Sequence, residues 1–243
     1  MNSDKILAVA GEGLSQKCRE RLSELGFEVV ILPPYGRLGR GVREHADLML
    51  FPIDRNIFIY RELTETLPLL VSKLRQRGYE ITEVDMIPEE KYPRDIALNC
   101  LKVGKYIFCK QKNASAEILR YAEAGGYEVV NVNQGYARCT ACPVGEGGII
   151  SADPSILTAA KCVGLKTLPI TVGGVELEGF DHGFIGGACG LFDNTLYFAG
   201  ELSAHPDGEL IKSFCAELGV DTVFLSQESL TDVGSIFFFD RSR

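Results

Sequence analysis

The chain has 243 residues, of which 46% are hydrophobic and 24% are charged, as in an average globular protein. Its 33 acidic and 25 basic residues give a net charge of -8, which argues against a broad nucleic-acid-binding face. No apolar run approaches the roughly 18 residues that span a bilayer, and the start, MNSDKILAVAG, lacks an apolar signal segment. We therefore expect a cytoplasmic protein with reduced cysteines and with neither a membrane nor a nucleic-acid partner.

Along the chain, five segments share one order: an amphipathic helix, a glycine and a short β-rich strand. The helices show apolar stripes at helical spacing, and the fourth begins with Asp153 and Pro154, which favour a helix start. The glycines provide the left-handed conformation that ends many helices. The stripes and glycines are, in order, Leu14, Cys18, Leu22, Leu25 and Gly26; Leu67, Leu70, Val71, Leu74 and Gly78; Ile118, Leu119, Ala122 and Gly126; residues 155–163 and Gly164; and Leu210, Phe214, Leu218 and Gly219.

Two apolar runs separated by a turn precede each helix, and the last pair is split between the chain ends. DVGSIFFF (232–239) supplies one run of that pair and KILAVAG (5–11) supplies the other. The repeat is therefore ββαβ, five times over residues 1–243. We predict a single α/β domain, a five-bladed propeller in which residues 235–239 and 5–10 share one blade, because closure removes exposed sheet edges. The alternative is an open three-layer α/β sheet without symmetry.

Polar residues gather around the first strand of each unit, which should line the central channel. Such a ring brings together groups that are distant in sequence. The candidates are His45, Asp47, Arg94, Asp95, Asn99, Cys139, Cys142, Glu146, Asp181, His182, Cys189, Asp232 and Ser235. The alternative is structural: these aspartates cap turns or pair with Arg94.

Three cysteines could provide a nucleophile. Cys189 lies in IGGACG, where glycines allow close approach, seven residues after His182, which could lower the pKa of its thiol. The alternative is a buried apolar cysteine on a packed strand. Cys139 and Cys142 form a Cys-x-x-Cys without a second such pair, so we expect no bound metal there and favour a thiol facing the channel. The glycine-rich stretches lack nucleotide-binding spacing, so we expect no cofactor.

Two segments, YPRDIALN (92–99) and GFDHGFIGGACG (179–190), together with the fivefold repeat, resemble the penteins, the guanidino-group-modifying superfamily. The resemblance implies a fivefold α/β propeller with covalent chemistry, in which a cysteine thiolate attacks an amidine carbon, carboxylates hold the cation and a histidine moves protons. The superfamily also contains a non-catalytic ribosome anti-association factor. Catalytic penteins generally place the nucleophilic cysteine at the start of the last blade's inner strand, where this chain has Gly234 and Ser235.

These observations predict a central pocket for a small cationic guanidino or amidino ligand, in a possible cysteine-dependent hydrolase or amidinotransferase-like enzyme. The expected catalytic residues are Cys189, His182 and Cys142, with Cys189 and His182 in one pocket. The expected substrate-binding residues are Asp95, which provides the counter-charge, Arg94, Asn99, Asp47, Glu146, Asp232 and Ser235. The alternative is a non-catalytic pentein that binds a macromolecular partner.

Overall fold

Fifteen strands form five separate three-stranded sheets in the computed structural model, which describes residues 5–241. In chain order the sheets contain β15 (Phe237–Phe239), β1 (Leu7–Gly11) and β2 (Glu28–Leu32); β3 (Leu50–Ile53), β4 (Asn56–Tyr60) and β5 (Glu80–Val84); β6 (Leu101–Val103), β7 (Tyr106–Cys109) and β8 (Glu128–Asn131); β9 (Ala141–Val144), β10 (Gly148–Ser151) and β11 (Lys166–Pro169); and β12 (Cys189–Phe192), β13 (Thr195–Phe198) and β14 (Asp221–Phe224).

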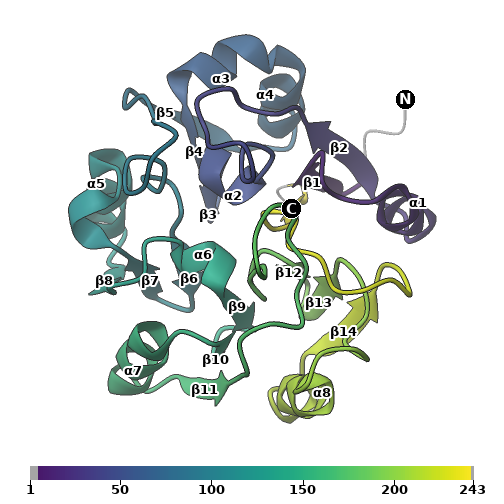
Figure 1. The fold of residues 1–243 in the computed structure, drawn as a ribbon. Helices are drawn as coiled ribbons and strands as arrows, with labels where there is room; N and C mark the ends of the chain where they lie inside the picture. Colours follow the sequence, from purple (N-terminus) through teal and green to yellow (C-terminus); the bar gives the residue numbers. More distant parts are fainter. Residues whose placement is uncertain (1–4, 242–243) are drawn as a thin grey trace.

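The sheets stand around a common centre as blades, which confirms the propeller and excludes the open sheet (Figure 1). In every blade the inner strand pairs antiparallel with the middle strand, and the middle strand pairs parallel with the outer one. A parallel pair needs a crossover connection, which in each blade includes a helix. Inner strands of neighbouring blades contact one another, as β6 does with β9 and β12 with β15.

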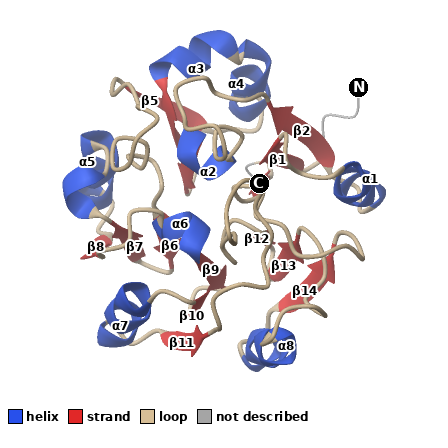
Figure 2. Cartoon of the chain, viewed as in Figure 1, coloured by secondary structure: helices blue, strands red, loops and turns tan. Residues whose placement is uncertain are grey.

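The crossover helices lie on the outside of the ring, whereas α2 and α6 lie near its centre (Figure 2). The outer helices are α1 (Gln16–Glu24), α3 (Arg61–Thr66), α4 (Pro68–Arg75), α5 (Ala116–Ala124), α7 (Pro154–Cys162) and α8 (Gly208–Glu217). The inner ones are α2 (Ala46–Met49) and α6 (Ala137–Thr140), and a short 3₁₀ turn, η1 (Gln111–Asn113), precedes α5. None of the helices in residues 5–241 is long and apolar enough to cross a membrane.

The ring closes through both ends of the chain, as the split repeat predicts. β15 pairs antiparallel with β1, with Phe239 opposite Leu7 and Phe237 opposite Val9. Phe239 and Leu7 are both fully buried. This pairing gives β1 a hydrogen-bonded neighbour on each side, so the closing blade has the same strand arrangement as the other four.

The five junction glycines all adopt positive φ, between 68° at Gly219 and 96° at Gly26. At Gly26, Gly126, Gly164 and Gly219 an added Cβ would meet nothing within 4 Å. Backbone conformation rather than crowding therefore favours glycine at these four helix ends.

Two of the predicted helix stripes are wrong by one residue at their ends. Leu25 follows α1 and is 39% exposed, and Leu210 on α8 is 56% exposed. The buried face of α8 is instead centred on Ile211 and Cys215. Leucine at helical spacing does not distinguish the centre of a buried face from its margin, because the neighbouring position i+1 lies only about 100° away.

Candidate functional site

A buried polar cluster lies at the centre of the ring, where the segments before the inner strands meet. We call it the polar centre and define it as His45, Asp47, Asn99, Cys139, Asp232 and Ser235, all buried. Asp47 lies on α2 just before β3, Cys139 lies on α6 just before β9, and Asn99 precedes β6. Short helical turns therefore place polar side chains at the centre from separate blades.

Asp47 links its own blade to three others through its side chain and backbone. Its Oδ1 accepts a hydrogen bond from the Cys139 thiol at 3.1 Å, and its Oδ2 accepts one from the Ser235 hydroxyl at 2.6 Å. Its carbonyl oxygen accepts a bond from Asn99 Nδ2 at 3.1 Å. The backbone N–H of Asp47 donates to the Gly234 carbonyl at 3.0 Å. This network exceeds simple turn capping, because its partners are far apart in sequence.

Asn99, in the segment before β6, completes the network. Its Oδ1 accepts the backbone N–H of Arg138 at 2.8 Å, which is the start of α6. Its Nδ2 also donates to the Cys139 sulfur at 3.1 Å. The amide thus fixes α6, and with it Cys139, against Asp47.

Ser235 occupies a backbone conformation that L-residues with a Cβ rarely adopt, with φ of 71°. Gly234 before it has φ of 69°, and a Cβ there would lie 2.2 Å from the Cα of His45. Both conformational freedom and close approach therefore require glycine at position 234. The strained conformation of Ser235 directs its hydroxyl to Asp47, and such strain concentrates at functional sites.

Asp232 and His45 lie at the boundary between the polar centre and an open cavity of about 620 Å³. The Asp232 carboxylate accepts the backbone N–H groups of Phe184 at 2.9 Å and Gly234 at 3.1 Å. Nε2 of His45 lies 3.9 Å from Asp232 Oδ1. Burial raises the pKa of Asp232 above its ordinary value, and the nearby His45 opposes this shift.

The rest of the cavity is formed by loops that carry both signs of charge. Its charged lining residues are Arg40, Arg43, Glu44, Glu178 and Asp232. Residues 173–188, which include the 177–180 part of this lining, run across the middle of the ring between β11 and β12 (Figure 1). Apart from His45, the loop 33–45 shows no functional signal in the sequence, because its charged residues form no recognisable motif.

Cys139 has polar neighbours in Asp47 and Asn99, yet its thiol favours the protonated form. Burial raises the pKa of the Cys139 thiol well above its ordinary value, and the Asp47 and Asp232 carboxylates raise it further. Its hydrogen bond to Asp47 keeps the proton on sulfur. In this arrangement Cys139 is a hydrogen-bond donor rather than a thiolate nucleophile.

Cys142 and Cys189 form a different environment, between two neighbouring blades. Their sulfur atoms lie 3.2 Å apart, and both residues are fully buried among apolar side chains of the second half of the chain. The glycines around Cys189 leave no space for a ligand, since a Cβ on Gly190 would lie 2.2 Å from the Ile236 carbonyl oxygen. Burial holds the pKa of Cys142 well above its ordinary value.

His182 lies apart from Cys189. Its Nδ1 is 3.1 Å from the Gly183 carbonyl oxygen, and its ring packs edge-on against Phe184. It lines a cavity of about 170 Å³ with Gln134, Thr140 and Asp153, and Cys189 is not part of that lining. The structure therefore does not place His182 and Cys189 in one pocket, because Cys189 lies within a packed strand and His182 in the loop before it.

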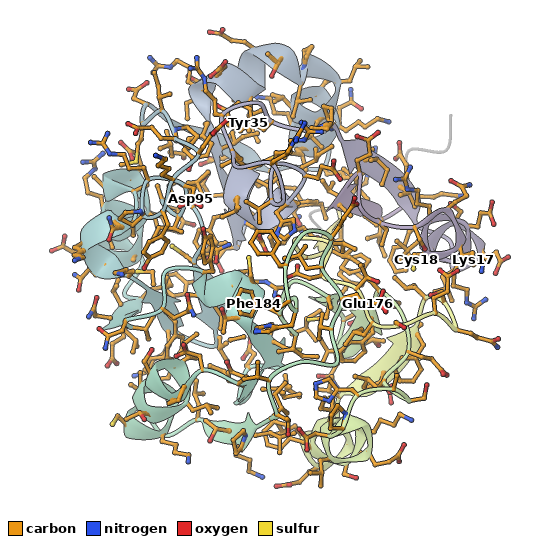
Figure 3. All side chains as sticks on the ribbon, viewed as in Figure 1. Lys17, Cys18, Tyr35, Asp95, Glu176 and Phe184 are labelled. Carbon is orange, nitrogen blue, oxygen red and sulfur yellow. The ribbon has the colours of Figure 1, made fainter. Side chains whose placement is uncertain are left out.

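The remaining predicted ligand-binding residues divide between core and surface. Asp95 is buried, with Oδ2 accepting a bond from the Tyr136 hydroxyl at 2.5 Å, and it does not line the 620 Å³ cavity. In Figure 3 it lies on the α5 side of the ring, whereas Phe184 lies nearer the centre. Arg94 is exposed and pairs with Glu89, and Glu146 is exposed on the turn between β9 and β10. Asp181 is also exposed.

Arg138 is a buried residue of the centre that the sequence analysis misses. Its guanidinium donates to the carbonyl oxygens of Gly186 at 2.7 Å and Cys189 at 3.0 Å. Arg138 precedes the first residue of β9 by three positions, as Asp47 precedes the first residue of β3. The candidates named from the sequence include the neighbouring Cys142 instead, which already lies inside β9.

Comparison with solved structures shows the same fold in enzymes of low sequence identity. Dimethylarginine dimethylaminohydrolase from Pseudomonas aeruginosa, a cysteine-to-serine mutant complexed with citrulline, matches with a TM-score of 0.52 at 12% identity over 92% of each chain. Inosamine-phosphate amidinotransferase from Streptomyces griseus matches with a TM-score of 0.55 at 12% identity, covering 99% of this chain and 94% of that one.

A third match is the N-terminal domain of an arginine dihydrolase from the ornithine-ammonia cycle in cyanobacteria, bound to product. It has a TM-score of 0.53 at 13% identity over 92% of each chain. No curated protein matches the sequence at a significant level. The five blades and these structural matches give the chain the pentein fold.

A family model covers nearly the whole propeller, from β1 to the start of β15. It matches residues 9–237. The chain therefore belongs to that family, which is described as a family of unknown function (DUF6873).

Proposed function

We propose that this pentein binds a small molecule with a guanidino or amidino group in the 620 Å³ cavity over the polar centre. The observation that carries the proposal is Asp232, a residue of the cavity lining whose carboxylate is fully buried behind the wall, where a cation in the cavity would approach it. Within residues 5–241 its one ion-pair partner is His45, at 3.9 Å. A buried carboxylate without a lysine or arginine partner favours a cationic ligand, since a charge-assisted bond would offset its desolvation.

The other charges of the cavity favour a ligand that also carries an anionic group. Glu44 and Glu178 add negative charge to the wall. Arg40 and Arg43, on the loop that carries Glu44, add positive charge. A guanidino amino acid presents a cation at one end and a carboxylate at the other, and planar guanidinium groups of arginine bind carboxylates with two parallel hydrogen bonds. The similar folds support this chemistry, because one of those enzymes is complexed with citrulline and another is an amidinotransferase.

Binding without cysteine-dependent hydrolysis fits the site better than covalent catalysis. The cavity lining contains no cysteine, and the last blade has Ser235 near the place of the pentein nucleophile. The nearest candidate thiol of the polar centre, Cys139, is held protonated, and a thiol is a far weaker nucleophile than a thiolate. Cys142 and Cys189 lie within the apolar core.

The test measures binding of arginine, agmatine and methylated arginines by calorimetry and thermal shift, with a chelator present throughout. We expect at least one compound to stabilise the wild-type chain. Asp232→Asn should weaken its binding about 10- to 100-fold, which corresponds to one lost charge-assisted interaction. Asp181→Asn is the matched control, since Asp181 is an exposed aspartate outside this cavity lining.

Asp232 accepts two backbone N–H groups, so the folded state of its variant is checked by circular dichroism before binding is compared. A parallel assay follows release of ammonia, amine or urea from the same compounds, and we expect none. Turnover would overturn the non-catalytic part of the proposal. Absence of binding to the whole panel would overturn the small-ligand role and favour a macromolecular partner.

A further inference from the structure

Three metal-ligating side chains, from two segments that are far apart in the sequence, meet in the polar centre. His45, Asp47 and Cys139 each offer one donor atom, and these atoms lie within 4.8 Å of one another. All three residues are at most 4% exposed. A nitrogen, an oxygen and a sulfur donor thus face one small volume that is shielded from solvent.

This donor set suits a divalent transition metal, and Zn²⁺ in particular. Zinc binds cysteine sulfur at about 2.3 Å, histidine nitrogen at about 2.0–2.1 Å and carboxylate oxygen at about 2.0–2.2 Å. In a tetrahedral zinc site such donors are about 3.4–3.6 Å apart, so side-chain rotations would draw the three atoms together around the ion. The thiolate excludes Mg²⁺ and Ca²⁺ as preferred occupants, because those ions favour oxygen ligands.

An independent observation comes from the unpartnered nitrogen of His45. Nδ1 is buried and has no hydrogen-bond partner within the described part of the chain, whereas Nε2 faces Asp232 at 3.9 Å. A buried polar atom without a partner costs free energy, which a bound ion would offset. Metal-bound histidines usually direct their second nitrogen to a carboxylate or carbonyl, and Asp232 is placed for that role.

The charge of the cluster also favours a cation. Asp47 and Asp232 are buried carboxylates, and neither forms an ion pair with a lysine or arginine among residues 5–241. A divalent ion balances the charges of its two anionic ligands, the Asp47 carboxylate and the Cys139 thiolate, with a neutral His45 as the third ligand. The Cys139 proton leaves to solvent as the sulfur–metal bond forms, and no oxidation or reduction occurs.

We propose that His45, Asp47 and Cys139 form a buried binding site for a divalent transition-metal ion, best matched by Zn²⁺. This departs from the sequence-based expectation of no metal, which considered Cys139 together with Cys142. Cys142 contacts Cys189 instead, and the ligands that accompany Cys139 come from the loop before β3 and from α2. With three protein ligands, a fourth coordination position is left, and His45 also lines the 620 Å³ cavity.

The experiment strips the full-length chain with a chelator, dialyses it against Zn²⁺ and measures bound metal by elemental analysis. Affinity follows from competition with a metal indicator, and Co²⁺ substitution reports sulfur ligation through its thiolate charge-transfer absorption. We expect one equivalent of Zn²⁺ per chain, a raised melting temperature and the thiolate–Co²⁺ band. Cys139→Ser and Asp47→Asn should each weaken Zn²⁺ binding at least tenfold, and Cys139→Ser should abolish the band.

Cys142→Ser is the matched control, because it removes the other thiol of the Cys-x-x-Cys and should retain the metal and the band. If Asp47→Asn fails to fold, His45→Gln tests the same site, since the His45 side chain makes no hydrogen bond within the described residues. The proposal is overturned if the wild-type chain retains no Zn²⁺, or if Cys142→Ser loses it as Cys139→Ser does. These measurements contain no guanidino compound, so their outcome is independent of the ligand-binding test.

Discussion

Cys139 and Cys142 are three residues apart, yet they lie in opposite kinds of environment. Cys139, on α6, donates to Asp47 and accepts from Asn99 within the polar centre. Cys142, on β9, faces Cys189 of the neighbouring blade among apolar side chains. The difference arises from the helical turn before the inner strand, which points side chains to the centre, whereas the strand points them between blades. Polar chemistry in this propeller therefore resides at the ends of the inner strands.

The largest expected loss of stability comes from removing β15, the strand that closes the ring. Deletion of residues 236–243 removes β15 and its pairing with β1. Phe239 is fully buried, and loss of a buried phenylalanine alone costs about 3–5 kcal/mol, a large part of the stability of a typical domain. We expect a chain that unfolds at much lower temperature or does not fold. An unchanged melting temperature in calorimetry would contradict closure by β15.

A smaller loss of stability, which arises in the polar centre alone, is expected from Asn99→Ala. The change leaves the backbone N–H of Arg138 and the carbonyl of Asp47 without their partner, at a cost of about 2–4 kcal/mol in the free energy of unfolding. Urea unfolding measures this directly. A loss below about 0.5 kcal/mol would mean that the network does not hold α6 against Asp47.

The apolar surroundings of Cys142 predict a smaller loss of stability. Cys142→Ala removes a thiol that packs mainly against hydrophobic groups, so unfolding should become easier by about 1 kcal/mol, as for a typical core substitution. The same urea measurement serves both variants. A loss as large as that of Asn99→Ala would contradict the division into a polar and an apolar cysteine environment.

Much of the fold follows from local sequence signals, whereas the site depends on which side chains meet. The junction glycines and the split last repeat predict the blades, because helix ends and strand periodicity are local properties. The contact between Asp47 and Cys139 depends on the ring bringing two distant turns together, which no local pattern specifies. Cys189 illustrates the limit, since Gly190 beside it accommodates the Ile236 backbone and Gly187 accommodates the Asp232 side chain, rather than a ligand.

The smallest expected effect is a pH dependence of stability that arises from Asp95, a buried carboxyl outside the cavity. Burial raises its pKa, and the Tyr136 hydroxyl opposes the shift. The folded protein therefore binds this proton more tightly than the unfolded chain, so ionisation costs stability as pH rises above about 3.9 toward the raised folded value. Asp95→Asn retains an acceptor for Tyr136 and removes this dependence.

Urea titrations at several pH values between 3.5 and 7 compare the two proteins. The free energy of unfolding of the wild type should fall relative to that of Asp95→Asn as the pH rises through this range, and should level off above the folded pKa. If the wild-type free energy of unfolding rose relative to that of Asp95→Asn as the pH increased, the pKa of Asp95 would be lowered in the folded protein and not raised.

If the proposed ligand binds in the cavity over the polar centre, its binding does not need the Cys142–Cys189 pair. The affinity of the Cys142→Ala/Cys189→Ala double variant, in chelator, for the guanidino compound that most stabilises the wild-type chain measures this. We expect an affinity within about twofold of wild type, since neither thiol lines the cavity. Loss of binding in the folded double variant would instead mean that the buried cysteine pair takes part in ligand binding.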